Sequence, residues 1–322
     1  MDRFKPSIII QNRHIQTVGA MIFTKPADIK IEIEQFELDD GDFLECFWYR
    51  YSNDPTTPIV ILFHGLAGSF KSHYIQQIMP KLATNNFNAV IMHFRSCSGK
   101  MNRLLRSYHS GETGDAKAFI KHIQHLYPKA KLFAVGYSLG ANMLLKMLGE
   151  YKDIAPITAA VSVSAPMQLD ICATQLNTGT SKIYQAYLMK DLRKFLYTKV
   201  KMHDTKKMIG LDIKDIKNIK TFWDFDEAYT APAHGFASAQ DYYNKSSSKQ
   251  YLRFIQTKTC IIQALDDPFM TPKILPHQHQ YTKDTQLLIC KHGGHVGFIQ
   301  NLFPKPRFYL NDTIIKYFNN FI

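Results

Sequence analysis

The chain has 322 residues, of which 45% are hydrophobic and 13% aromatic, enough apolar side chains to fill a large core. This composition excludes an intrinsically disordered chain, and the length fits a single α/β domain over residues 1–322 that carries an insertion. The formal net charge is +12, and no run of about 18 or more apolar residues is present, so we expect no transmembrane helix.

The first half of the chain predicts a hairpin and then alternating strands and helices. Polar and apolar residues alternate over 30–37, Asp39-Asp40-Gly41 is typical of a hairpin turn, and 43–49 is the expected partner strand. Pro58–Phe63 is a continuous apolar run, as expected for a strand buried on both faces. The further elements are a helix at 72–84, a strand at 88–94, a polar loop at 95–111, a helix at 113–127 and a strand at 131–135.

The second half resumes this alternation after an interruption. An apolar helix at 141–148 and a strand at 158–164 precede a polar, Lys-rich and mostly helical stretch, which we interpret as a cap insertion at about 167–250. Two more strands, at 259–264 and 286–290, and an amphipathic helix at 306–321 complete the chain. Successive strand-helix-strand units indicate a mainly parallel sheet, so the predicted fold class is α/β with antiparallel N-terminal strands at one edge.

The N-terminus and the cysteines predict a cytoplasmic protein. The first ten residues hold only a short apolar run, too short for the core of a signal peptide. The five cysteines are scattered and form no C-x-x-C pair, which argues against a disulfide framework or a zinc site.

Most of the excess positive charge lies in one segment. Residues 181–220 contain eleven Lys or Arg residues and four Asp residues. The sequence shows neither a basic patch interleaved with aromatic residues nor a helix-turn-helix signature, so nucleic acid is not an expected partner. We interpret the segment as a solvated surface, with transient contact to an anionic membrane surface as the alternative.

A five-residue motif, Gly136-Tyr137-Ser138-Leu139-Gly140, lies where a predicted strand meets a predicted helix. In a nucleophile elbow, Gly-x-Ser-x-Gly forms a tight strand-to-helix turn in which larger flanking side chains would clash. The turn holds the serine hydroxyl above the sheet, and the helix N-terminus favours negative charge that develops there. We therefore predict that Ser138 is a catalytic nucleophile; the alternative is an ordinary strand-to-helix turn.

A serine nucleophile needs a base and an acid, which follow it in the chain in the order acid, then base. His295 is the preferred base because two glycines before it form a tight loop, whereas His292 adjoins a strand end and is interpreted as a loop-bracing residue. Asp266 and Asp267 follow a core strand, where an acid that orients the imidazole is expected. Asp267 is preferred because Pro268 restricts the chain after it, and Asp266 stays the alternative.

Two backbone N–H groups are expected to bind the developing oxyanion. One belongs to Leu139, directly after the nucleophile, and the other to Leu66, just past His64-Gly65 in the loop after a buried strand. His64 itself is interpreted as shaping this loop rather than as a base. A reaction of this kind requires no metal or organic cofactor.

The loop at 95–111 is rich in Arg, Tyr and His side chains. One interpretation is that residues around the site contact a substrate that carries an acidic or phosphate group, the candidates being His64, Arg106, Tyr108 and His109. The preferred interpretation is that the arginines of the loop bind acidic neighbours such as Glu112 and hold the loop in place.

With these motifs the chain resembles the YheT-like α/β-hydrolases, a family that includes eukaryotic abhydrolase-domain phospholipases and fungal medium-chain ester synthases. The matching stretches are Asn12–Thr17, His64–Ser69, Phe94–Gly99, Asn102–Gly111, Gly136–Asn142, Phe225–Thr230, His234–Phe236, Asp241–Tyr243, Asp266–Phe269 and His292–His295. The resemblance implies the α/β-hydrolase fold, a charge relay of Ser138, Asp267 and His295, and medium-chain acyl substrates. Arg13 stands where the family usually has proline and Ser96 where it usually has glycine, and neither residue belongs to the relay.

The predicted function is that of a serine hydrolase that cleaves short- to medium-chain carboxylic esters, with a small-molecule or lipid ester as substrate. An acyltransferase that passes the same acyl group to an alcohol is the first alternative. A binding protein on a hydrolase scaffold is the second, because a fold does not determine a function.

Overall fold

The computed structural model describes residues 4–151 and 155–322. Residues 1–3, part of the N-terminal segment in which we expect no signal peptide, and residues 152–154 lie outside the described part of the chain. Within the described residues, none of the helices combines the length and the apolar composition needed to cross a lipid bilayer.

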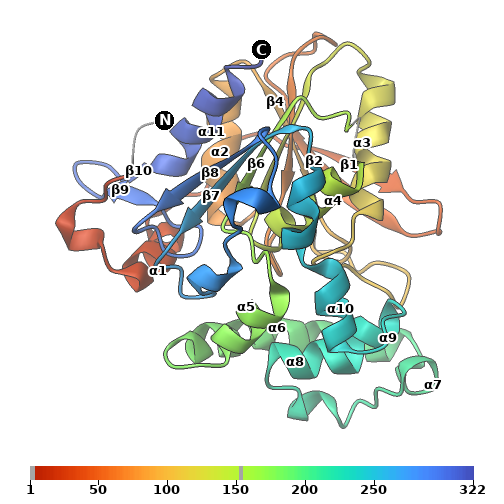
Figure 1. The fold of residues 1–322 in the computed structure, drawn as a ribbon. Coiled ribbons are helices and arrows are strands. Elements are labelled where there is room, and N and C mark those ends of the chain that lie inside the picture. The colour runs from red at the N-terminus through yellow and green to blue at the C-terminus, as the bar shows by residue number, and fades with distance from the viewer. Residues whose placement is uncertain (1–3, 152–154) are drawn as a thin grey trace.

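An eight-stranded sheet forms the centre of the molecule (Figure 1). Its strand order is β1-β2-β4-β3-β5-β6-β7-β8. The pairs β1–β2 and β2–β4 are antiparallel, and the remaining neighbours are parallel, which confirms the predicted α/β class with an antiparallel hairpin at one edge. The strands are β1 (Glu32–Glu37), β2 (Phe43–Tyr49), β3 (Ile59–Phe63), β4 (Asn88–Met92), β5 (Leu132–Tyr137), β6 (Ala159–Val163), β7 (Lys258–Ala264) and β8 (Thr285–Cys290).

Helices cover both faces of the sheet, and alternate side chains of each strand supply the core on each face. In β3, Ile59, Ile61 and Phe63 belong to one apolar cluster, whereas Val60 and Leu62 belong to the other. The first cluster also contains side chains of α3 and α4, and the second contains side chains of α2 and α11. These helices are α2 (His73–Ala83), α3 (Gly114–Leu126), α4 (Leu139–Tyr151) and α11 (Tyr309–Phe318).

One helix, α1 (Arg13–Phe23), is absent from the sequence prediction. Its N-terminus is capped by Asn12, whose side-chain oxygen accepts the backbone N–H groups of the first turn. Its large apolar residues Ile15, Val18 and Ile22 recur at helical spacing but are exposed, whereas its buried face consists of small and polar residues. The helix packs beside a two-stranded sheet of β9 (Ile299–Asn301) and β10 (Arg307–Phe308). The helix predicted at 306–321 therefore begins later than expected, because Arg307 and Phe308 form β10.

Between β6 and β7 the chain forms a helical insertion, residues 169–254, which lies as a separate layer beside the sheet (Figure 1). It has an apolar cluster of its own, with Met189, Leu192, Leu196 and Tyr229 at its centre. The helices of the insertion are α5 (Leu169–Leu176), α6 (Ser181–Met202), α7 (Thr205–Ile209), η2 (Ile216–Asn218), α8 (Phe222–Phe225), the π-helical turn η3 (Asp226–Thr230), α9 (Ala231–Ala233), α10 (Ala239–Ser246) and η4 (Ser248–Phe254). Short 3-10 helices elsewhere are η1 (Ile8–Ile10), η5 (Pro272–Ile274) and η6 (Gln278–Gln280).

Most lysines of the basic segment at 181–220 are exposed, but Lys199 is fully buried. Its Nζ donates hydrogen bonds to Asn102 Oδ1 at 2.6 Å and to the backbone oxygen of Leu104 at 2.5 Å. Burial lowers the pKa of Lys199 to about 8. This lysine therefore fastens the insertion to the polar loop between β4 and α3.

The same polar loop is held by a buried ion network. Arg95 is 2% exposed, and its guanidinium lies 2.7 Å from Asp115, 2.8 Å from Asp40 and 3.1 Å from Asp42. Arg103 forms a further pair with a glutamate at the surface. The arginines thus bind acidic neighbours, as the preferred interpretation of this loop expects.

We expect Arg95→Met to lower the free energy of unfolding by about 3–5 kcal/mol, because it leaves the buried carboxylates of Asp42 and Asp115 without a counter-charge. Urea unfolding followed by circular dichroism measures this change. Arg103→Met is the matched control: its pair with Glu37 is exposed, so the expected change is below about 1 kcal/mol. Equal losses in the two variants would contradict a structural role for the buried network.

Candidate active site

Ser138 lies in a tight turn between β5 and α4. Its φ of +51° is in the left-handed region, which residues other than glycine rarely adopt. A Cβ atom on Gly136 would lie 2.5 Å from the backbone oxygen of Gly140, and one on Gly140 would lie 2.5 Å from the backbone oxygen of His64. Gly136 is therefore required by the close packing of β5 against the start of α4, and Gly140 by the packing of α4 against the end of β3.

The side chains of Ser138, His295 and Asp267 form one hydrogen-bonded row. His295 Nε2 lies 2.9 Å from Ser138 Oγ, and His295 Nδ1 lies 2.8 Å from Asp267 Oδ2. The second oxygen of Asp267 accepts the backbone N–H of Phe269 at 2.8 Å. Asp267 and His295 are buried, whereas Ser138 is partly exposed to the cavity described below.

The neighbouring carboxylate of Asp266 has other partners. Its Oδ1 accepts the backbone N–H of Gly294 at 3.0 Å, and its Oδ2 lies 3.5 Å from His292 Nδ1. Burial raises the pKa of Asp266 above the usual value of an aspartate. Asp267 thus faces the imidazole of His295, whereas Asp266 braces the loop that carries this imidazole.

Helix α1 supports the His295 loop from the other side. The hydroxyl oxygen of Thr17 accepts the backbone N–H of His295 at 2.9 Å. A Cβ atom on Gly297 would overlap the backbone oxygen of Gln16, so the loop can pack against α1 only with glycine there. The sequence analysis predicts no role for the stretch Asn12–Thr17. The one sequence feature that indicates a helix start there is Asn12, which caps α1.

Two aromatic residues for which the sequence analysis predicts no role also contact the site. The ring of Phe269 stacks on the imidazole of His295, with centroids 3.9 Å apart and an interplanar angle of 7°. Tyr184, from α6, packs against Phe269 with centroids 5.1 Å apart, and its hydroxyl lies 2.9 Å from His14 Nδ1. This chain of contacts connects α1, the site and the helical insertion.

Both backbone amides predicted to bind an oxyanion belong to residues that line one cavity with Ser138. Leu139 is the first residue of α4, so its N–H has no acceptor within the helix. The amides on either side of Leu66 donate to tyrosine hydroxyl groups at 2.8 and 2.9 Å. In the part of the chain that the structure describes, the Leu66 N–H between them has no acceptor.

Two of the four predicted substrate-loop residues, Tyr108 and His109, line the same cavity. The hydroxyl of Tyr108 accepts the backbone N–H of Ala67 at 2.9 Å, so this residue also holds the loop that presents Leu66. Burial lowers the pKa of His109 to about 3, and this imidazole is therefore neutral at physiological pH.

The other two, His64 and Arg106, are not among the residues that line the cavity. His64 is fully buried, with Nδ1 at 2.7 Å from the backbone oxygen of Gly65 and Nε2 accepting the backbone N–H of Phe94 at 3.1 Å. Arg106 pairs with the carboxylate of Glu112. Their contacts within the protein explain why neither side chain reaches the cavity.

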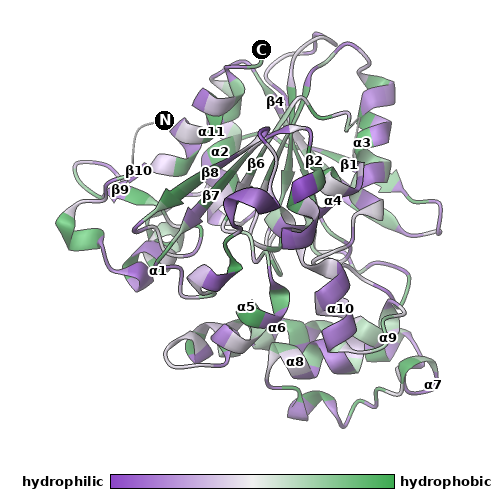
Figure 2. Ribbon diagram, in the orientation of Figure 1, coloured by the Kyte–Doolittle hydropathy of each residue, from purple (hydrophilic) through white to green (hydrophobic). Residues whose placement is uncertain are grey.

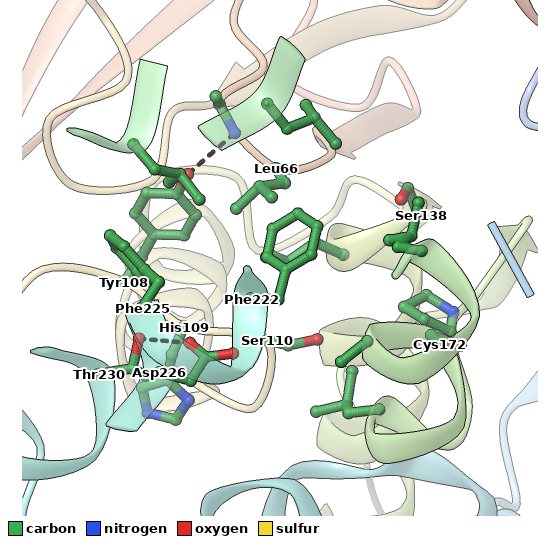
Figure 3. Close-up of a pocket in the computed structure, with 18 of the residues that line it drawn as sticks. Leu66, Tyr108, His109, Ser110, Ser138, Cys172, Phe222, Phe225, Asp226 and Thr230 are labelled. Carbon is green, nitrogen blue, oxygen red and sulfur yellow. Dashed lines mark hydrogen bonds between the residues drawn. The ribbon is translucent and has the colours of Figure 1, made fainter. Parts of the chain in front are cut away.

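The cavity has a volume of about 340 Å³ and a largely apolar wall. This volume is within the range of small-molecule sites. Figure 3 shows Ser138 and Leu66 on one side of it and Asp226 and Thr230 across from them. Much of the apolar wall comes from the helical insertion, including Leu169, Leu192, Phe195, Phe222, Phe225 and Tyr229.

Cys97 also lines the cavity and could in principle act as a nucleophile. Burial raises the pKa of its thiol to about 12, so it stays protonated and unreactive. Within residues 4–151 and 155–322, no group of three or more His, Cys, Asp or Glu side chains is placed to hold a metal ion.

Comparison with known proteins shows the family to which the chain belongs. The family model described as alpha/beta hydrolase fold matches residues 58–302. The chain is 35% identical, over 99% of its length and 94% of the relative, to the protein named "Putative esterase YheT" of Escherichia coli (strain K12). It is 24% identical to Phospholipase ABHD3 of Mus musculus, over 98% of this chain and 78% of that protein. Esterase Pf2001 from Pyrococcus furiosus superposes with a TM-score of 0.59 at 17% identity, over 91% of each chain, which shows a shared fold.

The chain therefore belongs to the α/β-hydrolase fold family and is a hydrolase enzyme. Within that family it belongs to the branch that includes YheT.

Proposed function

We propose that this protein is a serine hydrolase that cleaves carboxylic esters through an acyl-enzyme on Ser138. One observation carries the proposal: His295 lies 2.9 Å from Ser138 Oγ and 2.8 Å from Asp267 at the wall of an apolar cavity. In such a row the imidazole can take the serine proton, and the carboxylate holds the tautomer and stabilises the imidazolium that forms.

The proposed reaction has two stages. Ser138 Oγ attacks the ester carbonyl carbon while His295 Nε2 takes the hydroxyl proton, and the oxyanion accepts hydrogen bonds from the amides of Leu66 and Leu139. His295 then protonates the departing alcohol, which leaves the acyl group on Ser138. In the second stage His295 takes a proton from water as the water oxygen attacks the acyl carbonyl carbon. The bond from this carbon to Ser138 Oγ then breaks, His295 returns the proton to Oγ, and the free acid is released. No metal or organic cofactor takes part in this scheme.

The proposed substrates are esters with a short- to medium-length apolar acyl chain. Relatives named as esterase and phospholipase support ester substrates in general. The cavity volume of about 340 Å³ supports a chain of limited length, and residues of the helical insertion form much of its wall. We propose that this insertion acts as the cap of the site.

We expect Ser138→Ala to reduce kcat/KM on p-nitrophenyl butyrate and octanoate by a factor of about 10³ or more, because the acyl-enzyme cannot form. The variant should also lose labelling by a fluorophosphonate probe. Circular dichroism and the melting temperature show whether it is still folded. Wild-type rates in a folded Ser138→Ala protein would exclude the proposed mechanism.

Product analysis separates the two ways in which the acyl-enzyme can be resolved. In the presence of added ethanol or glycerol a pure hydrolase gives only free acid, whereas an acyltransferase gives a new ester. A wild-type protein that neither reacts with the probe nor turns over esters would favour the non-catalytic alternative.

We expect Asp267→Asn to lower kcat by about 10³–10⁴, because the amide does not hold the required imidazole tautomer. Asp266→Asn is the matched control, and we expect it to cost less than about tenfold, since His295 keeps its own carboxylate partner. Steady-state kinetics on one ester measures both effects. The opposite order of the two losses would assign the acid to Asp266.

Transient contact with an anionic membrane surface remains a proposal, and exposed side chains support it. Ile8, Ile9, Met21 and Ile22, from η1 and α1, are 86, 82, 51 and 70% exposed, and Figure 2 shows the hydrophobic colour at this N-terminal turn. Exposed lysines of the helical insertion supply positive charge. Apolar side chains combined with basic ones favour the interface of an anionic bilayer.

We propose that the protein is cytosolic, which its five free cysteines support.

We expect the protein to co-sediment with vesicles that contain phosphatidylserine, and less with vesicles of phosphatidylcholine alone or at high salt. The double variant Ile9→Asp and Ile22→Asp should weaken this binding about tenfold or more, because two apolar side chains no longer enter the interface. Ile33→Asp is the matched control, since Ile33 is 62% exposed on β1, whereas α1 packs on the loop that follows β8, the strand at the opposite edge of the sheet. Failure to bind acidic vesicles at any salt concentration would remove the proposal.

A further inference from the structure

The cavity has a polar region on the side of the helical insertion. Asp226 and Thr230, which begin and end the π-helical turn η3, line the cavity across from Ser138 (Figure 3). Both belong to the stretch Phe225–Thr230, which the sequence analysis singled out and to which the proposed mechanism gives no role. π-helical turns are frequent at functional sites, so this region is a candidate for substrate contact.

Asp226 is a buried acid without a cationic partner. It is 9% exposed, and its carboxylate oxygens accept one hydrogen bond each from the hydroxyl groups of Thr230 and Tyr243, both at 2.6 Å. Among the described residues, no Lys, Arg or His forms an ion pair with this carboxylate. Burial raises the pKa of Asp226 to about 6, so the group is mostly ionised at pH 7.5 and above.

The carboxylate has acceptor capacity that the protein leaves unused. An ionised carboxylate offers about four lone-pair sites, and Thr230 and Tyr243 fill two of them. A buried charge with unfilled acceptor sites is unfavourable until a further donor reaches it. Because Asp226 lines the cavity, a molecule bound there can supply that donor.

The surroundings of Asp226 make such a contact selective. Phe222, Phe225, Tyr229 and Tyr242 also line the cavity, and hydrogen bonds to a charged group are stronger in such a largely apolar lining than in water. His109 lies in the same wall but is neutral, because burial lowers the pKa of its imidazole to about 3. No positive charge among these lining groups competes with a donor from the substrate.

We propose that Asp226 binds a hydrogen-bond donor, a hydroxyl or an ammonium group, at the end of the substrate remote from the ester bond. The inference rests on the proposed ester hydrolysis at Ser138 and specifies its substrate class. The favoured esters carry an apolar chain that crosses the cavity and ends in a hydroxyl or amino group. Esters with a chain of equal length and a terminal methyl group leave the buried carboxylate unpaired and are bound less well.

A purely structural role for Asp226 predicts something different. In that case its function is to join η3 to α10 through the hydrogen bond from Tyr243. Tyr243→Phe and Thr230→Val remove the same two hydrogen bonds but keep the carboxylate. Substrate recognition requires the carboxylate alone, so these variants separate the two roles.

The test compares ethyl esters that differ only in the terminal group of the acyl chain. At each of several chain lengths, kcat/KM is measured at pH 8 for a methyl, a hydroxyl and an ammonium terminus with equal numbers of non-hydrogen atoms. The proteins are the wild type, Asp226→Asn, Tyr243→Phe, Thr230→Val and the matched control Asp224→Asn. Asp224 is an exposed acid two residues before Asp226 that does not line the cavity.

At one chain length, we expect the kcat/KM of the wild type to be about tenfold or more higher for a hydroxyl or ammonium terminus than for a methyl terminus. A gain of this size corresponds to one hydrogen bond to a charged group. The relative rates for hydroxyl and ammonium decide which donor the site takes. Asp226→Asn should bring the ratio to methyl close to one, whereas Asp224→Asn, Tyr243→Phe and Thr230→Val should keep it. No preference in the wild type, or the same loss of preference in Tyr243→Phe and Thr230→Val as in Asp226→Asn, would overturn the proposal.

Failure of the proposed function is recognised separately. Ser138→Ala protein is titrated in a calorimeter with ethyl 6-aminohexanoate, ethyl 6-hydroxyhexanoate and ethyl heptanoate, with and without Asp226→Asn. Tighter binding of a donor-bearing ester that depends on Asp226 supports the subsite even if the wild type hydrolyses no ester. Equal binding of all three overturns the subsite even if hydrolysis at Ser138 is established.

Discussion

The imidazole of His295 has to reach Ser138 with one nitrogen and Asp267 with the other, and the positions of the surrounding loops depend on this requirement. The distances are 2.9 and 2.8 Å. Parallel strands end at one edge of the sheet, so the loops after β5, β7 and β8 meet there. The loop after β8 contains two glycines with positive φ and is braced by Asp266 on one side and by α1 on the other. The orientation of one ring thus couples three strands and the N-terminal helix.

The sheet and the helical insertion contribute different properties to the cavity. The sheet side carries Ser138 and the amides of Leu66 and Leu139, which are the groups needed for acyl transfer. The insertion carries most of the apolar wall and also Asp226, whose buried carboxylate has unused acceptor sites. In this account the chemistry depends on the sheet edge, whereas the choice of substrate depends on the insertion.

The strands and the elbow were predictable because their signals are local. Buried strands such as β3 are continuous apolar runs, and the spacing of Gly136 and Gly140 around Ser138 defines the turn. Helix α1 carries an apolar stripe at helical spacing, but this stripe is exposed and small and polar residues are buried, so periodicity alone would place the wrong face against the core. The contacts of Thr17 and Phe269 with His295 join segments far apart in the chain, and no short-range pattern encodes them. The same holds for the placement of Asp226 in the cavity wall.

The central claim is that an acyl group becomes bonded to Ser138 during turnover. Rapid quenching of the wild-type protein with a p-nitrophenyl ester, followed by mass spectrometry of its peptides, tests this most directly. We predict a burst of p-nitrophenol and an acyl adduct on the peptide that contains Ser138, at the serine itself. Turnover without a burst and without an adduct at any quench time, or an adduct on another residue, would contradict it.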